Sequence, residues 1–189
     1  MDLVIFDLET TGLLPTMHDI IQIAAVRMSF GAVLHKECYS TFVNPGYRIS
    51  PFITSYTGIS NSNVRNAPSV ATALSEFSRF VGGTTVLAHN GHRFDMPFIR
   101  AACMKTGLAT RTVNYADSIH LSRGLWKGTR KHGLDAIIER LSLSTRVFRR
   151  HDARGDVGIL AEAVKRMWRK LDPDRTRFPA PLFTSVFPQ

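Results

Sequence analysis

Residues 3–9 read LVIFDLE, an apolar run that leads into two carboxylates. The short, partly β-branched run predicts a buried strand that reaches Asp7. If the strand continues, Asp7 and Glu9 lie two positions apart and point to the same face. Adjacent carboxylates repel each other, and a divalent cation bound through oxygen would neutralise them. The same pattern also suits one carboxylate that caps a turn and one that is solvated.

The rest of the chain alternates between strand and helix patterns. The predicted strands are 3–6, 20–28, 33–43, 85–88 and 113–116, and the main predicted helices are 67–81, 95–106, 133–141 and 153–171. Three strands followed by alternating helices and strands indicate an α/β fold, a mixed five-stranded sheet flanked by helices. We expect one domain over residues 1–171. Because the last 18 residues contain several prolines, we expect an irregular C-terminal tail at 172–189.

Composition limits the function classes. The 189 residues are 44% hydrophobic and 21% charged, as in an ordinary globular domain. The apolar runs are too short for a membrane span, and the N-terminus lacks the features of a secretory signal. Two widely spaced cysteines, Cys38 and Cys103, fit a reducing compartment. We therefore expect an intracellular protein, in the cytoplasm or nucleus, with no membrane partner.

The net charge of +9 is concentrated in one segment. Residues 123–150 carry 8 basic and 2 acidic residues, whereas residues 1–122 carry 9 and 8. Such a segment favours a polyanion, and nucleic acid is the commonest polyanionic partner of a basic soluble domain. A solvated basic face explains the charge alone equally well.

Further acidic residues recur where strands and helices meet. Asp95 stands at the predicted start of a helix and suits an N-cap, while Asp156 lies just inside the last long helix. His151 precedes Asp156 by five positions, and a neutral imidazole beside a metal site can accept a proton from water. His89 and His92 form an H-x-x-H pair, but no third nitrogen or sulfur ligand is near in sequence, which disfavours zinc.

Taken together, these segments resemble the three motifs of the DEDDh exonucleases. They are FDLETTG at 6–12, HNGHRFD at 89–95 and HDARGD at 151–156. The resemblance covers residues 3–171 and is nearest in motif to the three-prime repair exonucleases, with a looser match to bacterial proofreading subunits. It implies a ribonuclease H-like fold, in agreement with the α/β pattern.

The resemblance also implies roles for individual positions. Asp7, Glu9, Asp95 and Asp156 match the family's metal-binding carboxylates, and His151 matches its general base. Further matches are to positions that contact nucleic acid, namely Thr10, Leu13 and Arg93. The implied cofactors are two Mg²⁺ ions, which Mn²⁺ can replace. The implied reaction is 3′-to-5′ removal of nucleoside 5′-monophosphates from single-stranded or frayed ends.

Three questions stay open at this point. DNA is favoured as substrate, but relatives in this family also trim RNA, and no residue here separates ribose from deoxyribose. A catalytically weak module that binds nucleic-acid ends within a larger complex is a less favoured alternative. The resemblance allows a homodimer, since the repair exonucleases are dimers.

Overall fold

A computed structural model describes residues 1–144 and 153–189. Its strands are β1 (Asp2–Thr10), β2 (Ile20–Ser29), β3 (Ala32–Phe42), β4 (Thr85–Ala88), β5 (Thr110–Asp117) and β6 (Phe183–Pro188). Its helices are α1 (Pro51–Thr57), α2 (Asn61–Val64), α3 (Val70–Val81), α4 (Asp95–Thr106), α5 (Ser118–Leu125), α6 (Leu134–Leu141) and α7 (Ala153–Leu171). No helix in these two ranges is long and apolar enough to cross a bilayer.

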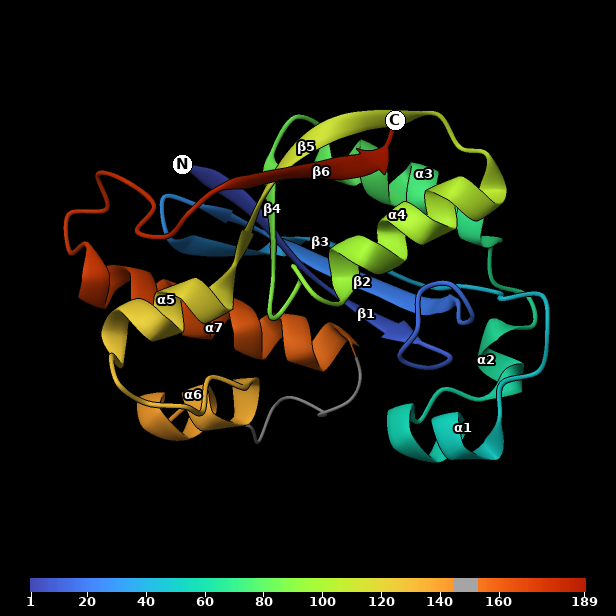
Figure 1. The fold of residues 1–189 in the computed structure, drawn as a ribbon, viewed down its shortest axis with the longest axis horizontal. Helices are drawn as coiled ribbons and strands as arrows, with labels where there is room; N and C mark the ends of the chain where they lie inside the picture. Colours follow the sequence, from blue (N-terminus) through green and yellow to red (C-terminus); the bar gives the residue numbers. More distant parts are fainter. Residues whose placement is uncertain (145–152) are drawn as a thin grey trace.

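The strands form one mixed sheet in the order β3-β2-β1-β4-β5-β6. β1 lies in the interior of the sheet. It pairs antiparallel with β2 from Asp2 to Thr10 and parallel with β4 over residues 3–5. Helices α3 and α4 cover one face of the sheet and α5, α6 and α7 the other, while α1 and α2 lie beyond the end of β1 (Figure 1). The predicted mixed α/β sheet with helices on both faces is confirmed.

The alternation along β1 divides the core into two layers. Val4 and Phe6 pack in the cluster that includes α3 and α4, whereas Leu3 and Ile5 pack in the cluster that includes α7. All four side chains are buried. Since side chains alternate along a strand, this pattern also fixes the faces on which the following carboxylates emerge.

Within the described residues the sheet has six strands, so the predicted number of five was wrong. The sixth, β6, lies in the segment 172–189 that was expected to be irregular, and it pairs antiparallel with β5. Pro188 is its last residue, and a proline is tolerated at the end of an edge strand. Phe187 in β6 is fully buried and packs against Phe77 of α3, with ring centroids 5.5 Å apart. The end of the chain therefore contributes to the core.

We expect Phe187→Ala to destabilise the protein by about 3–5 kcal/mol, because it removes a buried aromatic ring and leaves a cavity. The neighbouring Val186 is 39% exposed and serves as a control, since Val186→Ala should cost far less. Urea unfolding of both variants measures the difference. Equal, small losses in the two variants would contradict a structural role for β6.

Candidate metal centre

Two carboxylates emerge on the same side of β1. The strand stays extended to Thr10, so Asp7 and Glu9 continue the face on which Leu3 and Ile5 contact the α7 layer. Both carboxylates are partly exposed. The shared face predicted from the spacing of the two residues is therefore present.

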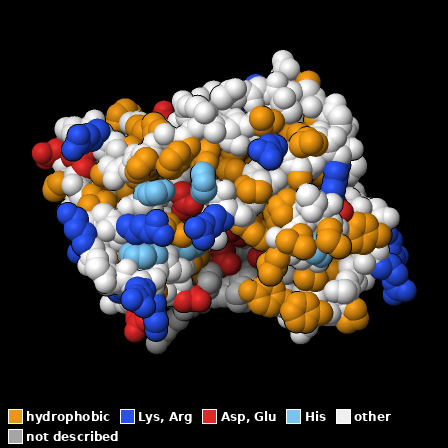
Figure 2. Space-filling model, viewed as in Figure 1, with side chains coloured by type: hydrophobic (Ala, Val, Ile, Leu, Met, Phe, Trp, Pro, Cys, Tyr) orange, Lys and Arg blue, Asp and Glu red, His pale blue; other side chains and the backbone are white. Residues whose placement is uncertain are grey.

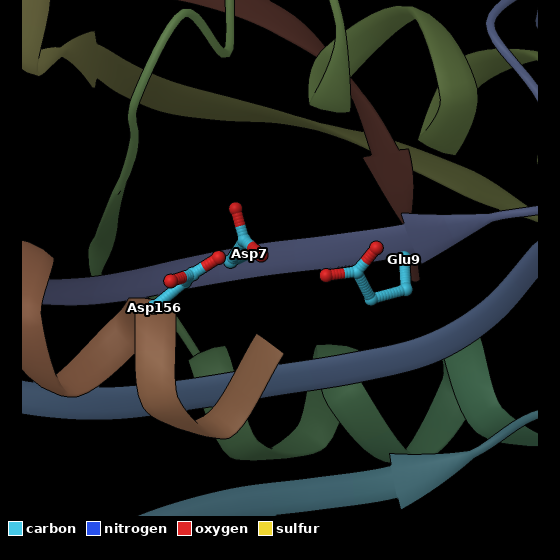
Figure 3. Close-up of side chains that lie close together, drawn as sticks. All are labelled: Asp7, Glu9 and Asp156. Carbon is cyan, nitrogen blue, oxygen red and sulfur yellow. The ribbon is translucent and has the colours of Figure 1, made fainter. Parts of the chain in front are cut away.

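The first turn of α7 brings a third carboxylate to this face. The backbone N–H of Ala153 donates to Oε1 of Gln22 at 3.1 Å, and Gln22 is the β2 partner of Glu9. This bond fixes the start of α7 beside the end of β1. Asp156 lies one turn further and is 8% exposed. Carboxylate oxygens of Asp7, Glu9 and Asp156 all lie within 4.8 Å of one another, and the side chains approach from a strand and a facing helix (Figure 3).

Asp95 approaches β1 from α4, which covers the other face. It is the first residue of α4, as predicted, and the N-cap is Phe94, so the alternative role of Asp95 as an N-cap is excluded. Its Oδ1 accepts the backbone N–H of Leu8 at 3.2 Å, between Asp7 and Glu9 in sequence. Within the described residues, the 4.8 Å group holds the other three carboxylates and not Asp95.

The environment of Asp95 favours its protonated form. The pKa of Asp95 is raised to about 8, mainly by burial and also by the negative charges of Asp117 and Glu9, against backbone hydrogen bonds that lower it. A cation beside this carboxyl would favour ionisation instead. The buried acid thus fits a site completed by positive charge.

The donor set suits a hard divalent ion. The cluster offers carboxylate oxygens from Asp7, Glu9 and Asp156, with Asp95 behind β1. Mg²⁺ and Mn²⁺ prefer oxygen ligands of this kind. The two candidate zinc histidines have other hydrogen-bond partners, since Nδ1 of His89 lies 2.8 Å from the Ser118 hydroxyl and Nδ1 of His92 lies 2.5 Å from the Tyr115 hydroxyl.

A cleft of ≈ 430 Å³ opens beside the carboxylates. Its opposite wall is apolar and includes Leu13, Phe52 and Tyr56, all of them exposed. Phe52 and Tyr56 lie one turn apart on α1 with their rings stacked at 6.4 Å. Thr10 also lines the cleft, but its hydroxyl donates to the carbonyl of Gly12 at 2.6 Å and so fixes the turn after β1.

Arg93 does not line the carboxylate cleft. It lines a second hollow together with His120 and Arg123, separate from the lining of the carboxylate cleft. Figure 2 shows basic and histidine side chains gathered on one side of the central acidic hollow and apolar side chains on the other. The acidic group is therefore flanked by a wall suited to phosphate and a wall suited to bases.

Asp117 is a structural residue of the site that sequence reasoning missed. It is buried and accepts the backbone N–H groups of Asn90, His92 and Ile119 at 2.9–3.1 Å. These bonds hold the turn that leads from β4 to Asp95. A carboxylate directly after a predicted apolar strand, in the sequence Ala-Asp-Ser, was the available signal.

Two predicted features fall partly or wholly outside this geometry. His151 lies outside the described residues, as does part of the basic segment 123–150. The first residues of the basic segment, 123–125, form the end of α5.

Comparison with known proteins shows that this chain is similar to nucleases. The exonuclease family model RNase_T matches residues 4–164. The PolC-type DNA polymerase III of Caldanaerobacter subterraneus subsp. tengcongensis is 35% identical over 170 residues, which cover 90% of this chain and 12% of that protein. The DNA polymerase III subunit epsilon-like protein of Rhodobacter capsulatus is 38% identical over 165 residues, which cover 87% of this chain and 23% of that protein. The chain thus spans less than a quarter of the length of either relative.

Solved structures share the fold at lower identity. The nuclease domain of 3′hExo, a DEDDh family member bound to rAMP, superposes with a TM-score of 0.79 at 18% identity over 96% of both chains. Exonuclease X in complex with 5′ overhanging duplex DNA gives a TM-score of 0.71 at 24% identity, covering 89% of this chain and 92% of that one. The six-stranded sheet therefore has the ribonuclease H-like arrangement expected from the motifs.

Proposed function

Because this chain belongs to the DEDDh exonuclease family and carries a metal-dependent exonuclease domain, we propose that it removes nucleoside 5′-monophosphates from DNA 3′ ends by two-metal hydrolysis. The proposal rests on the group of three carboxylates within 4.8 Å, which lies in a cleft with an apolar wall, while Arg93 and Arg123 line a separate hollow. Such a group has the ligands and the access that metal-assisted attack on a phosphodiester requires.

We assign the metal-holding role to Asp7, Glu9, Asp95 and Asp156, with two Mg²⁺ ions as the natural complement and Mn²⁺ as a substitute. When bound, these ions supply an activated water and a counter-charge for the leaving 3′ oxygen. His151 would accept the proton of that water at a ring nitrogen, a role that rests on the sequence motif alone.

The walls of the cleft suggest how a strand would lie. Leu13 and the stacked rings of Phe52 and Tyr56 offer apolar surface for the terminal base, and base–aromatic stacking tolerates any sequence. Arg93 and Arg123 would contact phosphates, which adds affinity without base recognition. A narrow cleft of this kind favours single-stranded or frayed ends, because the last base must leave its partner.

DNA is the favoured substrate because one relative above is a PolC-type DNA polymerase III and the other is named for its likeness to the epsilon subunit of DNA polymerase III. RNA is the second candidate substrate, because the structurally similar nuclease domain of 3′hExo was solved with bound rAMP. A module that binds ends without cutting is less supported, since all four positions that match the family's metal ligands hold an acidic residue. The homodimer and the intracellular location in cytoplasm or nucleus stay predictions.

A digestion panel tests the proposal. With Mg²⁺ present, we expect rapid loss of single-stranded DNA and of 3′ overhangs, slower loss of blunt duplexes and little loss of matched RNA. Activity should fall steeply between about 50 and 200 mM salt, because phosphate contacts release counterions. A closed single-stranded circle of the same composition is the control, and its efficient digestion would exclude an exonuclease.

A further inference from the structure

The segment between β1 and β2 presents apolar side chains to solvent beside the carboxylates. Leu13, Leu14 and Met17 are 79%, 53% and 70% exposed. Gly12 and Leu13 line the carboxylate cleft. Solvent-exposed apolar residues give a loop little packing energy, so other contacts must set its position.

The backbone N–H of Thr11 donates to the carbonyl of Asp19 at 2.9 Å. Side chains add a closed ring of three hydrogen bonds among Thr11, Asp19 and Tyr47, which we call the Asp19 ring. The backbone N–H of Asp19 donates to Oγ1 of Thr11 at 3.0 Å. The hydroxyls of Thr11 and Tyr47 lie 2.7 Å apart, and the Tyr47 hydroxyl donates to Oδ2 of Asp19 at 2.9 Å. Since the Tyr47 hydroxyl donates its hydrogen bond to Asp19, the Thr11 hydroxyl must be the donor to Tyr47. Hydrogen bonds linked in this way polarise and strengthen one another.

Helix α4 secures the same ring from the side. Nζ of Lys105, in the last turn of α4, lies 3.0 Å from Oδ1 of Asp19 and 3.2 Å from the carbonyl of His18. Asp95, at the first turn of α4, contacts the backbone of Leu8. One helix therefore holds β1 near the carboxylates and also holds the far end of the loop that follows β1.

The carboxylates do not depend on the Asp19 ring in the same way. Asp7 and Glu9 lie within the β1–β2 ladder, opposite Ala24 and Gln22, and the register shifts only between Glu9 and Thr10. A displaced loop would thus move Leu13 while the ladder keeps both carboxylates in place.

We propose that Asp19 is a positioning residue, which holds the loop 11–19 so that Leu13 can contact the terminal nucleotide. This inference rests on the proposed function. It predicts a specific kinetic signature, since weaker substrate contact raises KM while intact chemistry preserves kcat.

The decisive variant is Asp19→Ala, assayed on single-stranded DNA with Mg²⁺. We expect KM to rise about 5-fold or more, with kcat within about 2-fold of wild type. If Asp19 acted only through its charge, its removal would weaken the repulsion of DNA and lower KM. Loss of positioning would raise KM, so the two explanations predict opposite changes in KM. The matched control is Asp2→Ala, which removes an exposed, hydrogen-bonded carboxylate at the other end of β1 and should not raise KM.

Tyr47→Phe opens the Asp19 ring without changing charge, and it should raise KM in the same direction. Unchanged or lower KM in Asp19→Ala, at a melting temperature equal to wild type, would overturn the inference. If Asp19→Ala does not fold, unchanged KM in Tyr47→Phe would overturn it. A wild-type protein that digests no nucleic acid would instead refute the proposed function, and the positioning role with it.

Discussion

Asp7→Asn lowers the rate of nucleotide release by about 10³-fold or more, equivalent to about 4 kcal/mol of transition-state stabilisation. The substitution keeps the shape of the side chain and removes one charged ligand from the group of three carboxylates. The strand around it stays buried and paired, so the fold should persist. Initial rates on single-stranded DNA at saturating Mg²⁺, with melting temperatures, measure both effects.

Asp2→Asn is the matched control for this variant. Asp2 opens the same strand, is exposed and accepts the hydroxyl of Ser29 at 2.7 Å, far along the strand from the carboxylate group. We expect wild-type rates from it. Near wild-type rates from Asp7→Asn would remove Asp7 from the metal site, and Asp156→Asn should repeat the result obtained with Asp7→Asn.

Asp95→Asn is expected to separate activity from stability. Activity should fall by about 10²-fold or more, because a ligand that completes the site is lost. Without metal, Asp95→Asn should be more stable than wild type at alkaline pH, because the variant does not have to bury a carboxylate charge. Burial raises the pKa of Asp95 from its usual 3.8 to about 8 in the folded chain.

The sign of the pH effect follows from proton binding. Between pH 4 and 8 the folded wild type retains a proton on Asp95 that the unfolded chain has lost, so its stability falls as pH rises through this window. The amide introduced by Asp95→Asn does not titrate. The difference in unfolding free energy between this variant and wild type should therefore grow over the same pH window and level off above it. Urea unfolding with a chelator at pH 4, 6 and 9 measures the trend. Parallel pH profiles of the two proteins would argue against a buried, protonated Asp95.

Local patterns predicted the part of the site that is built from local geometry. Asp7 and Glu9 share a face because side chains alternate along a strand, and this needs no tertiary information. Asp156 lies near the start of a helix whose predicted and observed bounds, Ala153–Leu171, agree. Neither pattern shows that this strand and this helix meet. That prediction came from the resemblance of the motifs to those of the DEDDh exonucleases.

The missed parts depend on contacts distant in sequence or on signals that were overlooked. Strand β6 pairs with β5 and packs Phe187 against Phe77 of α3, and these long-range contacts cannot be read from a proline-rich tail. Helix α1 was recognisable from Ser50 as N-cap followed by Pro51 at the first position, a strong start signal. Without α1, the apolar wall formed by Phe52 and Tyr56 could not be anticipated.

We propose that the carboxylate group uses divalent metal to hydrolyse the last phosphodiester at a 3′ end. The most direct measurement follows single-stranded DNA labelled on its 3′-terminal nucleotide, with Mg²⁺ and after chelation. We predict that labelled nucleoside 5′-monophosphate is the first product, formed with Mg²⁺ and abolished by the chelator. Release that persists in chelator, or label that first leaves in longer fragments, would contradict the claim.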